Sequence, residues 1–146
     1  MSATPEAHVT LLCFDFGIRQ IGVAYGQTFS GTAQPVAVLR ARDGQPQWEQ
    51  VTRLVAEWQP QRLLVGLPLN MDGTESDFCT RVRRFAGRLH ARTGKPVTLM
   101  DERLSTAEAK RDSGSGRDYR RHPVDGLAAA LILRTWLSEP AAGRDL

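Results

Sequence analysis

The first apolar stretch of the chain reads Leu11-Leu12-Cys13-Phe14-Asp15-Phe16-Gly17. A nearly continuous apolar run of this length is typical of a strand that is buried on both faces of a sheet. Asp15 lies at the end of this run, close to a glycine that allows a tight turn. A carboxylate in that position often does no more than bond a turn backbone, so other residues must decide whether Asp15 is functional.

The segments that follow predict a meander and then alternating strands and helices. Two further strands are expected at Ile21–Tyr25 and Val36–Leu39, joined by short turns. The later patterns are a helix at 46–58 with Pro46 in its first turn, a strand at 63–65, a helix at 78–94, a strand at 97–100, and helices from 105 and 123. This order predicts an α/β fold with a mixed five-stranded sheet, in which a three-strand antiparallel meander is joined to parallel strands, with helices on both faces.

Length and composition indicate one globular domain. The chain has 146 residues, 41% of them hydrophobic, which is enough for one core and too little for two ordinary domains. We expect flexible tails at 1–8 and 139–146 around a single domain at 9–138. The formal net charge of +3 and the pI near 9.3 permit a polyanionic partner without requiring one.

Several features predict a cytoplasmic protein without a membrane partner. Polar residues open the chain, and no apolar stretch of the sequence approaches membrane-spanning length. The two cysteines, Cys13 and Cys79, lie far apart and neither has CxxC spacing. Reduced thiols are therefore expected in place of a zinc site or a disulfide.

Two further acidic residues accompany Asp15 at the ends of other elements. Glu102 follows the apolar run Val97–Met100, and successive strand side chains point to opposite faces. Only one of Asp101 and Glu102 can therefore share a face with Asp15; we predict Glu102, with Asp101 bonding the backbone or Arg103. Asp125 lies in the first turn of the last helix, where the helix dipole alone already favours an acid.

Taken together, the three carboxylates predict a metal site for phosphodiester cleavage. Two-cation cleavage needs carboxylates that converge from distant parts of the chain and leave coordination positions open for water and phosphate. We expect two Mg²⁺ or Mn²⁺ ions, with Asp15 contacting both and Glu102 and Asp125 holding one each. Carboxylates without such ions would repel a nucleic acid.

The loop Gly66–Thr74 is the predicted substrate loop. Ligands bind at the carboxyl ends of strands in open α/β sheets, so Asn70 and Thr74 are expected to bond phosphate or base. A structural alternative is a connecting loop in which Asp72-Gly73 turns and Thr74 caps the arginine-rich helix, whose charges are usually only solvated. Other expected substrate contacts are Gly17, Arg19, Arg103, Arg117, Arg120, Arg121 and His122.

These segments together resemble the YqgF (RuvX) family of pre-16S rRNA nucleases, also described as Holliday junction resolvases. The resemblance runs from about Leu11 to Leu137. It is carried by Phe14–Gly17 with Ile21–Ala24, by Val65–Thr74, by Asp101–Thr106 and by Val124–Asp125. It implies a ribonuclease H-like fold and trimming of the 5′ end of the small-subunit ribosomal RNA precursor, with Asp15, Glu102 and Asp125 at the family's acidic positions. The segment Lys110–Pro123 departs from the family in being short and in carrying arginine where lysine is common.

Three other functions fit parts of the sequence. A DNA junction resolvase would cut two strands symmetrically and would need a two-fold dimer. A non-catalytic RNA-binding escort would not need the carboxylates. Actin-like ATPases share the pattern Asp15-x-Gly17-x4-Gly22, but they need two domains. The expected partner is nucleic acid, a ribosomal RNA precursor or branched DNA, with ribosomal particles as a further partner; the protein is expected to be a monomer or a weak homodimer.

Overall fold

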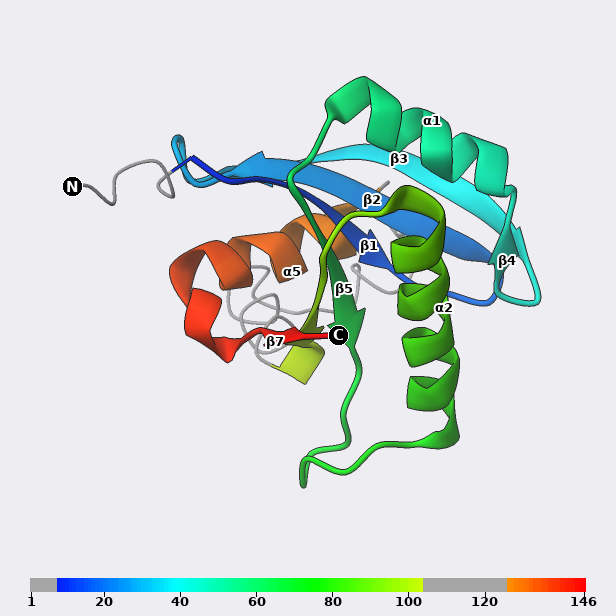
Figure 1. Ribbon diagram of the computed structural model, residues 1–146. Coiled ribbons are helices and arrows are strands. Elements are labelled where there is room, and N and C mark those ends of the chain that lie inside the picture. Colours follow the sequence, from blue (N-terminus) through cyan, green and yellow to red (C-terminus); the bar gives the residue numbers. More distant parts are fainter. Residues whose placement is uncertain (1–7, 104–125) are drawn as a thin grey trace.

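The structure, a computed structural model, describes residues 8–103 and 126–146 (Figure 1). Its helices and strands are, in chain order, β1 (Thr10–Asp15), β2 (Gln20–Gln27), β3 (Thr32–Arg42), β4 (Gln45–Pro46), α1 (Trp48–Trp58), β5 (Arg62–Leu67), α2 (Asp77–Thr93), β6 (Val97–Asp101), α5 (Leu127–Ser138), the 3-10 helix η2 (Pro140–Ala142) and β7 (Arg144–Asp145). Among these residues, no helix is both long enough and apolar enough to cross a membrane.

A single mixed sheet organises the described residues, in the order β4-β3-β2-β1-β5-β6-β7. The first three strands form the predicted antiparallel meander, and β1, β5 and β6 run parallel to one another. The predicted class is therefore confirmed. The sheet has two more strands than the five expected, because two-residue strands pair at its edges. The third strand also spans Thr32–Arg42, well beyond the predicted Val36–Leu39.

Helices cover both faces of the sheet, with α1 and α2 on one face and α5 on the other (Figure 1). Side chains alternate along β1: Leu12 and Phe14 pack in the cluster beneath α1 and α2, whereas Leu11 and Cys13 pack beneath α5. All four are fully buried. Burying an apolar side chain of Leu or Phe size contributes roughly 1.5–3 kcal/mol, so this alternation fixes the register of β1 firmly.

The expected first turn of the helix at Pro46 is wrong, because that residue belongs to β4 and α1 begins at Trp48. Asp43 and Gly44 both have left-handed φ angles, 51° and 80°. Two such residues in succession make the tight turn of a β-hairpin, and Arg42 pairs with Gln45 across it. A proline, which lacks an N–H, is tolerated on such an edge strand.

Residues 139–146, predicted as a flexible tail, contain regular secondary structure. Residues 140–142 form η2, and β7 pairs antiparallel with β6. The Asp145 carboxylate accepts hydrogen bonds from Arg62 and Thr98, both at 3.1 Å. Composition alone did not reveal this edge strand, since its stability comes from partners more than forty residues away.

Candidate active site

Asp15 lies at the carboxyl end of β1 on the face covered by α5. It follows Cys13 by two residues on the same strand face, and Cys13 belongs to the α5 cluster. Its partner in the register across β2 is Gly22. A Cβ on Gly22 would lie 3.3 Å from the Cα of Gly126 and 3.9 Å from the Cβ of Asp15. The start of the last helix therefore packs close beside Asp15.

Glu102 reaches the same face from two strands away. It directly follows β6, which is separated from β1 by β5, and the space over β5 is kept open by Gly66. A Cβ on Gly66 would lie 2.7 Å from Glu102 Oε2 and 2.7 Å from Ile132 Cδ1 of α5. The Glu102 side chain thus extends across the neighbouring strand, toward β1, beneath the last helix.

The two carboxylates are close enough to influence each other. Burial raises the pKa of Asp15 to about 6. Burial, and then the negative charges of Asp15 and Asp101, raise the pKa of Glu102 to about 8. Burial also raises the pKa of the Cys13 thiol, with further contributions from Asp15 and Glu102. The α5 face therefore holds a concentration of negative charge, which favours either protons or a cation.

Asp101 lies next to Glu102 but was predicted to face the opposite side of the sheet and to bond the backbone or Arg103. Its carboxylate accepts hydrogen bonds from the backbone N–H of Arg103 at 2.9 Å and from the guanidinium, the shortest at 2.7 Å. Burial alone would raise the pKa of Asp101, but these hydrogen bonds outweigh it and hold the pKa below its usual value. The prediction that Asp101 bonds Arg103 and the backbone is confirmed.

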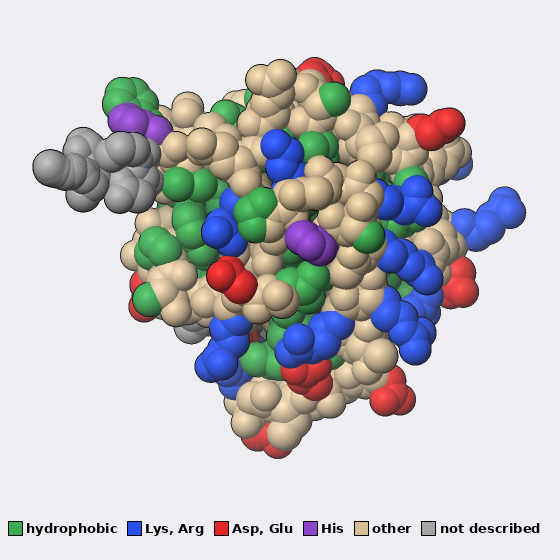
Figure 2. Space-filling view, in the orientation of Figure 1, with side chains coloured by type: hydrophobic (Ala, Val, Ile, Leu, Met, Phe, Trp, Pro, Cys, Tyr) green, Lys and Arg blue, Asp and Glu red, His purple; other side chains and the backbone are tan. Residues whose placement is uncertain are grey.

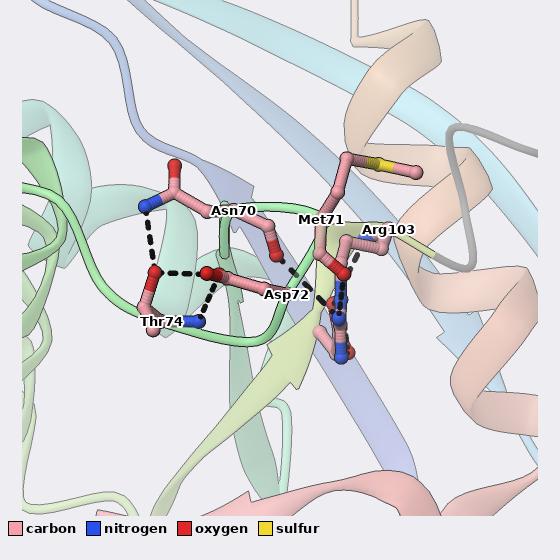
Figure 3. A network of polar contacts seen from close by, with 6 residues as sticks. Asn70, Met71, Asp72, Thr74 and Arg103 are labelled. Carbon is pink, nitrogen blue, oxygen red and sulfur yellow. Dashed lines mark hydrogen bonds and ion pairs between the residues drawn. The ribbon is translucent and has the colours of Figure 1, made fainter.

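The predicted substrate loop, Gly66–Thr74, contains a network of polar contacts (Figure 3). The Asn70 amide donates to Thr74 Oγ1 at 3.0 Å, and the Thr74 hydroxyl donates to Asp72 at 2.6 Å. Arg103 donates to the carbonyl oxygen of Met71 at 2.9 Å. Both predicted contact residues, Asn70 and Thr74, are exposed, but their side chains mainly bond one another. The cap of α2 is Ser76, so the predicted cap at Thr74 is wrong.

Met71 lies in the same loop, and no role was predicted for it from the sequence. Its side chain is 89% exposed, whereas its carbonyl is fixed by Arg103. Figure 3 shows the side chain pointing away from the polar network. A large apolar residue among the polar residues of Asn70–Thr74 was the available signal. Arg103, predicted as a substrate contact, connects Asp101 to this loop, and its contact with a substrate stays a prediction.

The other predicted contacts near Asp15 lie in the turn between β1 and β2. A Cβ on Gly17 would collide with the backbone oxygen of Gln20, so the turn requires glycine. Arg19 is exposed, and its carbonyl accepts a hydrogen bond from Ala41 at 2.8 Å. The guanidinium of Arg19 is thus available at the end of the sheet where Asp15 lies.

The remaining predicted site residues lie in the segment 104–125, outside the described residues. They are Arg117, Arg120, Arg121, His122 and Asp125. Within residues 8–103 and 126–146, no group of three or more His, Cys, Asp or Glu side chains could hold a metal ion. The described part of the site therefore supplies two carboxylates, and the third, Asp125, stays a prediction.

Comparison with known proteins identifies the family. The family model described as "RuvX: Holliday junction resolvase" matches residues 9–139. A protein of Marinobacter nauticus named "Putative pre-16S rRNA nuclease" is 55% identical over 90% of this chain and 94% of its own length. A protein of Azotobacter vinelandii with the same name is 57% identical over 91% of this chain and 96% of its own.

A solved structure shares the fold at low sequence identity. Thermus thermophilus RuvC, in complex with a Holliday junction substrate, matches with a TM-score of 0.58 at 15% identity. The match covers 95% of this chain and 100% of that one. It confirms the ribonuclease H-like fold expected from the sequence, and the family model with the two relatives confirms the resemblance. The chain therefore belongs to the RuvX family.

Proposed function

We propose that this protein is a divalent-metal-dependent nuclease that processes the 5′ end of the 16S ribosomal RNA precursor. The substrate follows the names of the two relatives, which are more than half identical to this chain. The single observation that carries the nuclease mechanism is the pair of half-buried carboxylates, Asp15 at the carboxyl end of β1 and Glu102 directly after β6. Burial raises the pKa of each of these carboxyl groups. Neither group forms an ion pair within the described residues.

The residues fit divalent cations that prefer oxygen ligands. Carboxylate oxygens suit Mg²⁺ and Mn²⁺, and no sulfur or imidazole ligand is needed. Asp15 and Glu102 would hold the ions, with Asp125 as a third ligand, since Gly126 beside it packs on Gly22. When bound, such ions activate water for in-line attack and stabilise the leaving oxygen.

The chain's own residues would position the nucleic acid. The Asn70–Thr74 loop is held to β6 through Arg103, so the loop and Glu102 keep a fixed relation. Arg19 would meet phosphate beside Asp15, and Arg117, Arg120, Arg121 and His122 would do so from the segment before Asp125. Arginine suits this role, because its planar fork bonds phosphate through two donors.

We further propose that the protein works in the cytoplasm as a monomer or a weak homodimer, on precursor RNA alone or within ribosomal particles. The cysteines support a reducing compartment, since Cys13 and Cys79 are both buried and unpaired. Activity on assembling particles but not on naked RNA would indicate that ribosomal components complete the substrate.

Resolution of branched DNA is the second candidate. The description of the family model favours it. Symmetrical cleavage of a junction needs two active sites related by a two-fold axis, so it requires a dimer. Light scattering on the protein alone and with a four-way junction would test this requirement. A strictly monomeric protein on the junction would exclude a symmetrical resolvase.

The deciding experiment compares two substrates under two metal conditions. Purified protein is incubated with end-labelled RNA spanning the 5′ junction of the precursor and with a DNA four-way junction, in Mn²⁺ or in EDTA. Asp15→Asn is the test variant, and Glu57→Gln, on the exposed side of α1, is the control. We expect Mn²⁺-dependent RNA cleavage that Asp15→Asn abolishes and the control retains. Binding without cleavage, unchanged by Asp15→Asn and by EDTA, would contradict the nuclease and favour an RNA-binding escort.

A further inference from the structure

The arginines of α2 have different environments, although the sequence presents them as one charged run. Arg83 is paired with the Glu75 carboxylate through two of its nitrogens. The Arg92 guanidinium lies 4.8 Å from the ring centre of Trp48. These two arginines are therefore occupied by partners within the protein. The remaining three, Arg81, Arg84 and Arg88, do not share these contacts.

The three remaining arginines line a pocket between α2 and the β3–β4 hairpin. Their spacing of three and four residues places them on one face of the helix. The pocket has a volume of about 340 Å³, and its other lining residues are Phe16, Asp43, Gly44, Gln45 and Phe85. Figure 2 shows Lys and Arg side chains gathered along the right-hand side of the molecule, over α2. We call this feature the arginine pocket.

One side of the arginine pocket is built and fixed by the hairpin. Arg81 donates to the Asp43 carbonyl at 2.7 Å and to its carboxylate at 3.0 Å. Gly44 keeps the pocket open, because a Cβ there would lie 2.8 Å from Phe16 and 3.1 Å from the Arg81 guanidinium. The Arg81 guanidinium therefore lines one side of the pocket, where Asp43 holds it in place and partly neutralises its charge.

The other side of the pocket carries positive charge that no described residue neutralises. Arg84 and Arg88 are both exposed, and neither forms an ion pair within residues 8–103 and 126–146. The lining therefore contains three guanidinium groups and a single carboxylate, that of Asp43. Such an excess favours an anion with several acceptor oxygens.

We propose that the arginine pocket binds a backbone phosphate of the nucleic acid strand, next to the cleavage site but outside it. This inference rests on the proposed function in taking nucleic acid as the ligand. Phe16, which lines the pocket, directly follows Asp15, so the pocket lies at the same end of β1 as the carboxylates. The nucleic acid strand would pass around this end of the sheet, from the face with the carboxylates to the face with the arginine pocket.

The chemistry of the lining selects phosphate over base. The aromatic rings of Phe16 and Phe85 are 8% and 3% exposed and pack on each other at 5.1 Å, so they offer no free face for stacking a base. A second copy of the chain is a poor occupant, since it would place like charges opposite one another. Phosphate contacts position a strand without reading its sequence, which suits a site beside the cleavage position.

The salt dependence of binding tests the proposal directly. Each phosphate contact to a single strand contributes about 0.7 to the slope of log Kobs against log salt concentration. Arg84→Ala/Arg88→Ala removes the contacts to one phosphate and should therefore reduce the magnitude of the slope by about 0.7 and weaken binding about tenfold. The probe is fluorescein-labelled single-stranded RNA from the precursor junction, followed by anisotropy in Mg²⁺ with all proteins carrying Asp15→Asn to keep the RNA intact.

Two control variants separate charge at this place from charge in general. Arg53→Ala/Arg134→Ala removes two exposed arginines from α1 and α5 and should leave the slope unchanged. Arg84→Lys/Arg88→Lys should retain the slope, because the charge remains. An unchanged slope in the Ala double variant, with unchanged circular dichroism, would overturn the proposal and leave the pocket to an acidic protein segment.

The proposed nuclease function is tested separately, by cleavage with the protein that keeps Asp15. A reduced slope in the Ala variant, together with absence of cleavage by the unsubstituted protein, would retain the phosphate site and reject the nuclease. Cleavage by the unsubstituted protein with an unchanged slope in the Ala variant would retain the nuclease and reject the phosphate site.

Discussion

The two faces of the sheet differ most where β1 ends. On the α5 face, Asp15 and Glu102 are half-buried; burial raises the pKa of both, and the charge of Asp15 raises that of Glu102 further. On the α2 face, one residue further along, Phe16 lines a pocket with three arginines. The acidic face repels a polyanion until cations bind, whereas the basic face attracts one at all times. Binding and cleavage should therefore respond to different variants and different conditions.

The largest effect should come from removing a charge on the acidic face. Glu102→Gln should reduce cleavage by more than about 100-fold, the upper range for residues that only support a metal ligand. In EDTA at alkaline pH the same variant should unfold at a higher temperature than the unsubstituted protein, because a buried charge has been removed. Cleavage assays and thermal unfolding check both parts. A variant that loses activity and stability together would indicate misfolding in place of lost metal binding.

The second-largest effect should be the pH dependence of the free energy of unfolding of the metal-free protein. The folded-state pKa values of Asp15 and Glu102, about 6 and about 8, exceed the ordinary values of 3.8 and 4.5. The folded state then binds more protons than the unfolded state between about pH 4 and pH 8, so the free energy of unfolding falls as pH rises through that window. The loss should reach ~2 kcal/mol or more.

Added Mg²⁺ should reverse this trend, since the metal binds the deprotonated carboxylates and gains affinity as pH rises. Chemical unfolding across the window, with EDTA or with Mg²⁺, measures both slopes. In the double variant Asp15→Asn/Glu102→Gln, the free energy of unfolding should depend less on pH under both conditions. A metal-free slope that the double variant leaves intact would assign the pH dependence to other groups.

Gly66→Ala tests whether the open space over β5 matters for the acidic face. The added Cβ would meet Glu102 Oε2 and Ile132 Cδ1, both at 2.7 Å. Overpacking of this kind costs about 1–3 kcal/mol, and displacing Glu102 should also reduce cleavage. Gly87→Ala is the matched control, because a Cβ there meets nothing within 4 Å. In the middle of a helix it should stabilise the protein by about 0.5–1 kcal/mol with cleavage retained.

The smallest expected effect concerns the loop beside the acidic face. Arg103→Lys keeps a positive charge but loses the fork that joins Asp101 to the Met71 carbonyl. We expect a small loss of stability and a raised KM, with kcat changed less. Steady-state cleavage and denaturant unfolding measure these changes. A fall in kcat alone would place Arg103 in the chemical step.

The alternation of strand side chains made the acidic face predictable. Leu11 to Phe16 specify which residues face which helix, and the same period correctly separated Asp101 from Glu102. The arginine pocket was not predictable, because it depends on Asp43 and Arg81 meeting across thirty-eight positions of the chain. Pro46 and the residues of β7 were misassigned for the same reason, since hairpin and edge pairing are non-local. Asp125 and the arginines before it stay predictions.

The position of Asp15 next to Phe16 also determines where the chain tolerates insertions. One residue added within β1 would turn every following side chain of the strand to the other face, placing the carboxylate among phenylalanines and a phenyl ring among carboxylates. The turn at Gly31, where nothing lies within 4 Å of an added Cβ, has no such constraint. Insertion scanning should therefore find β1 intolerant at every position, while a peptide epitope placed at that turn leaves both faces intact.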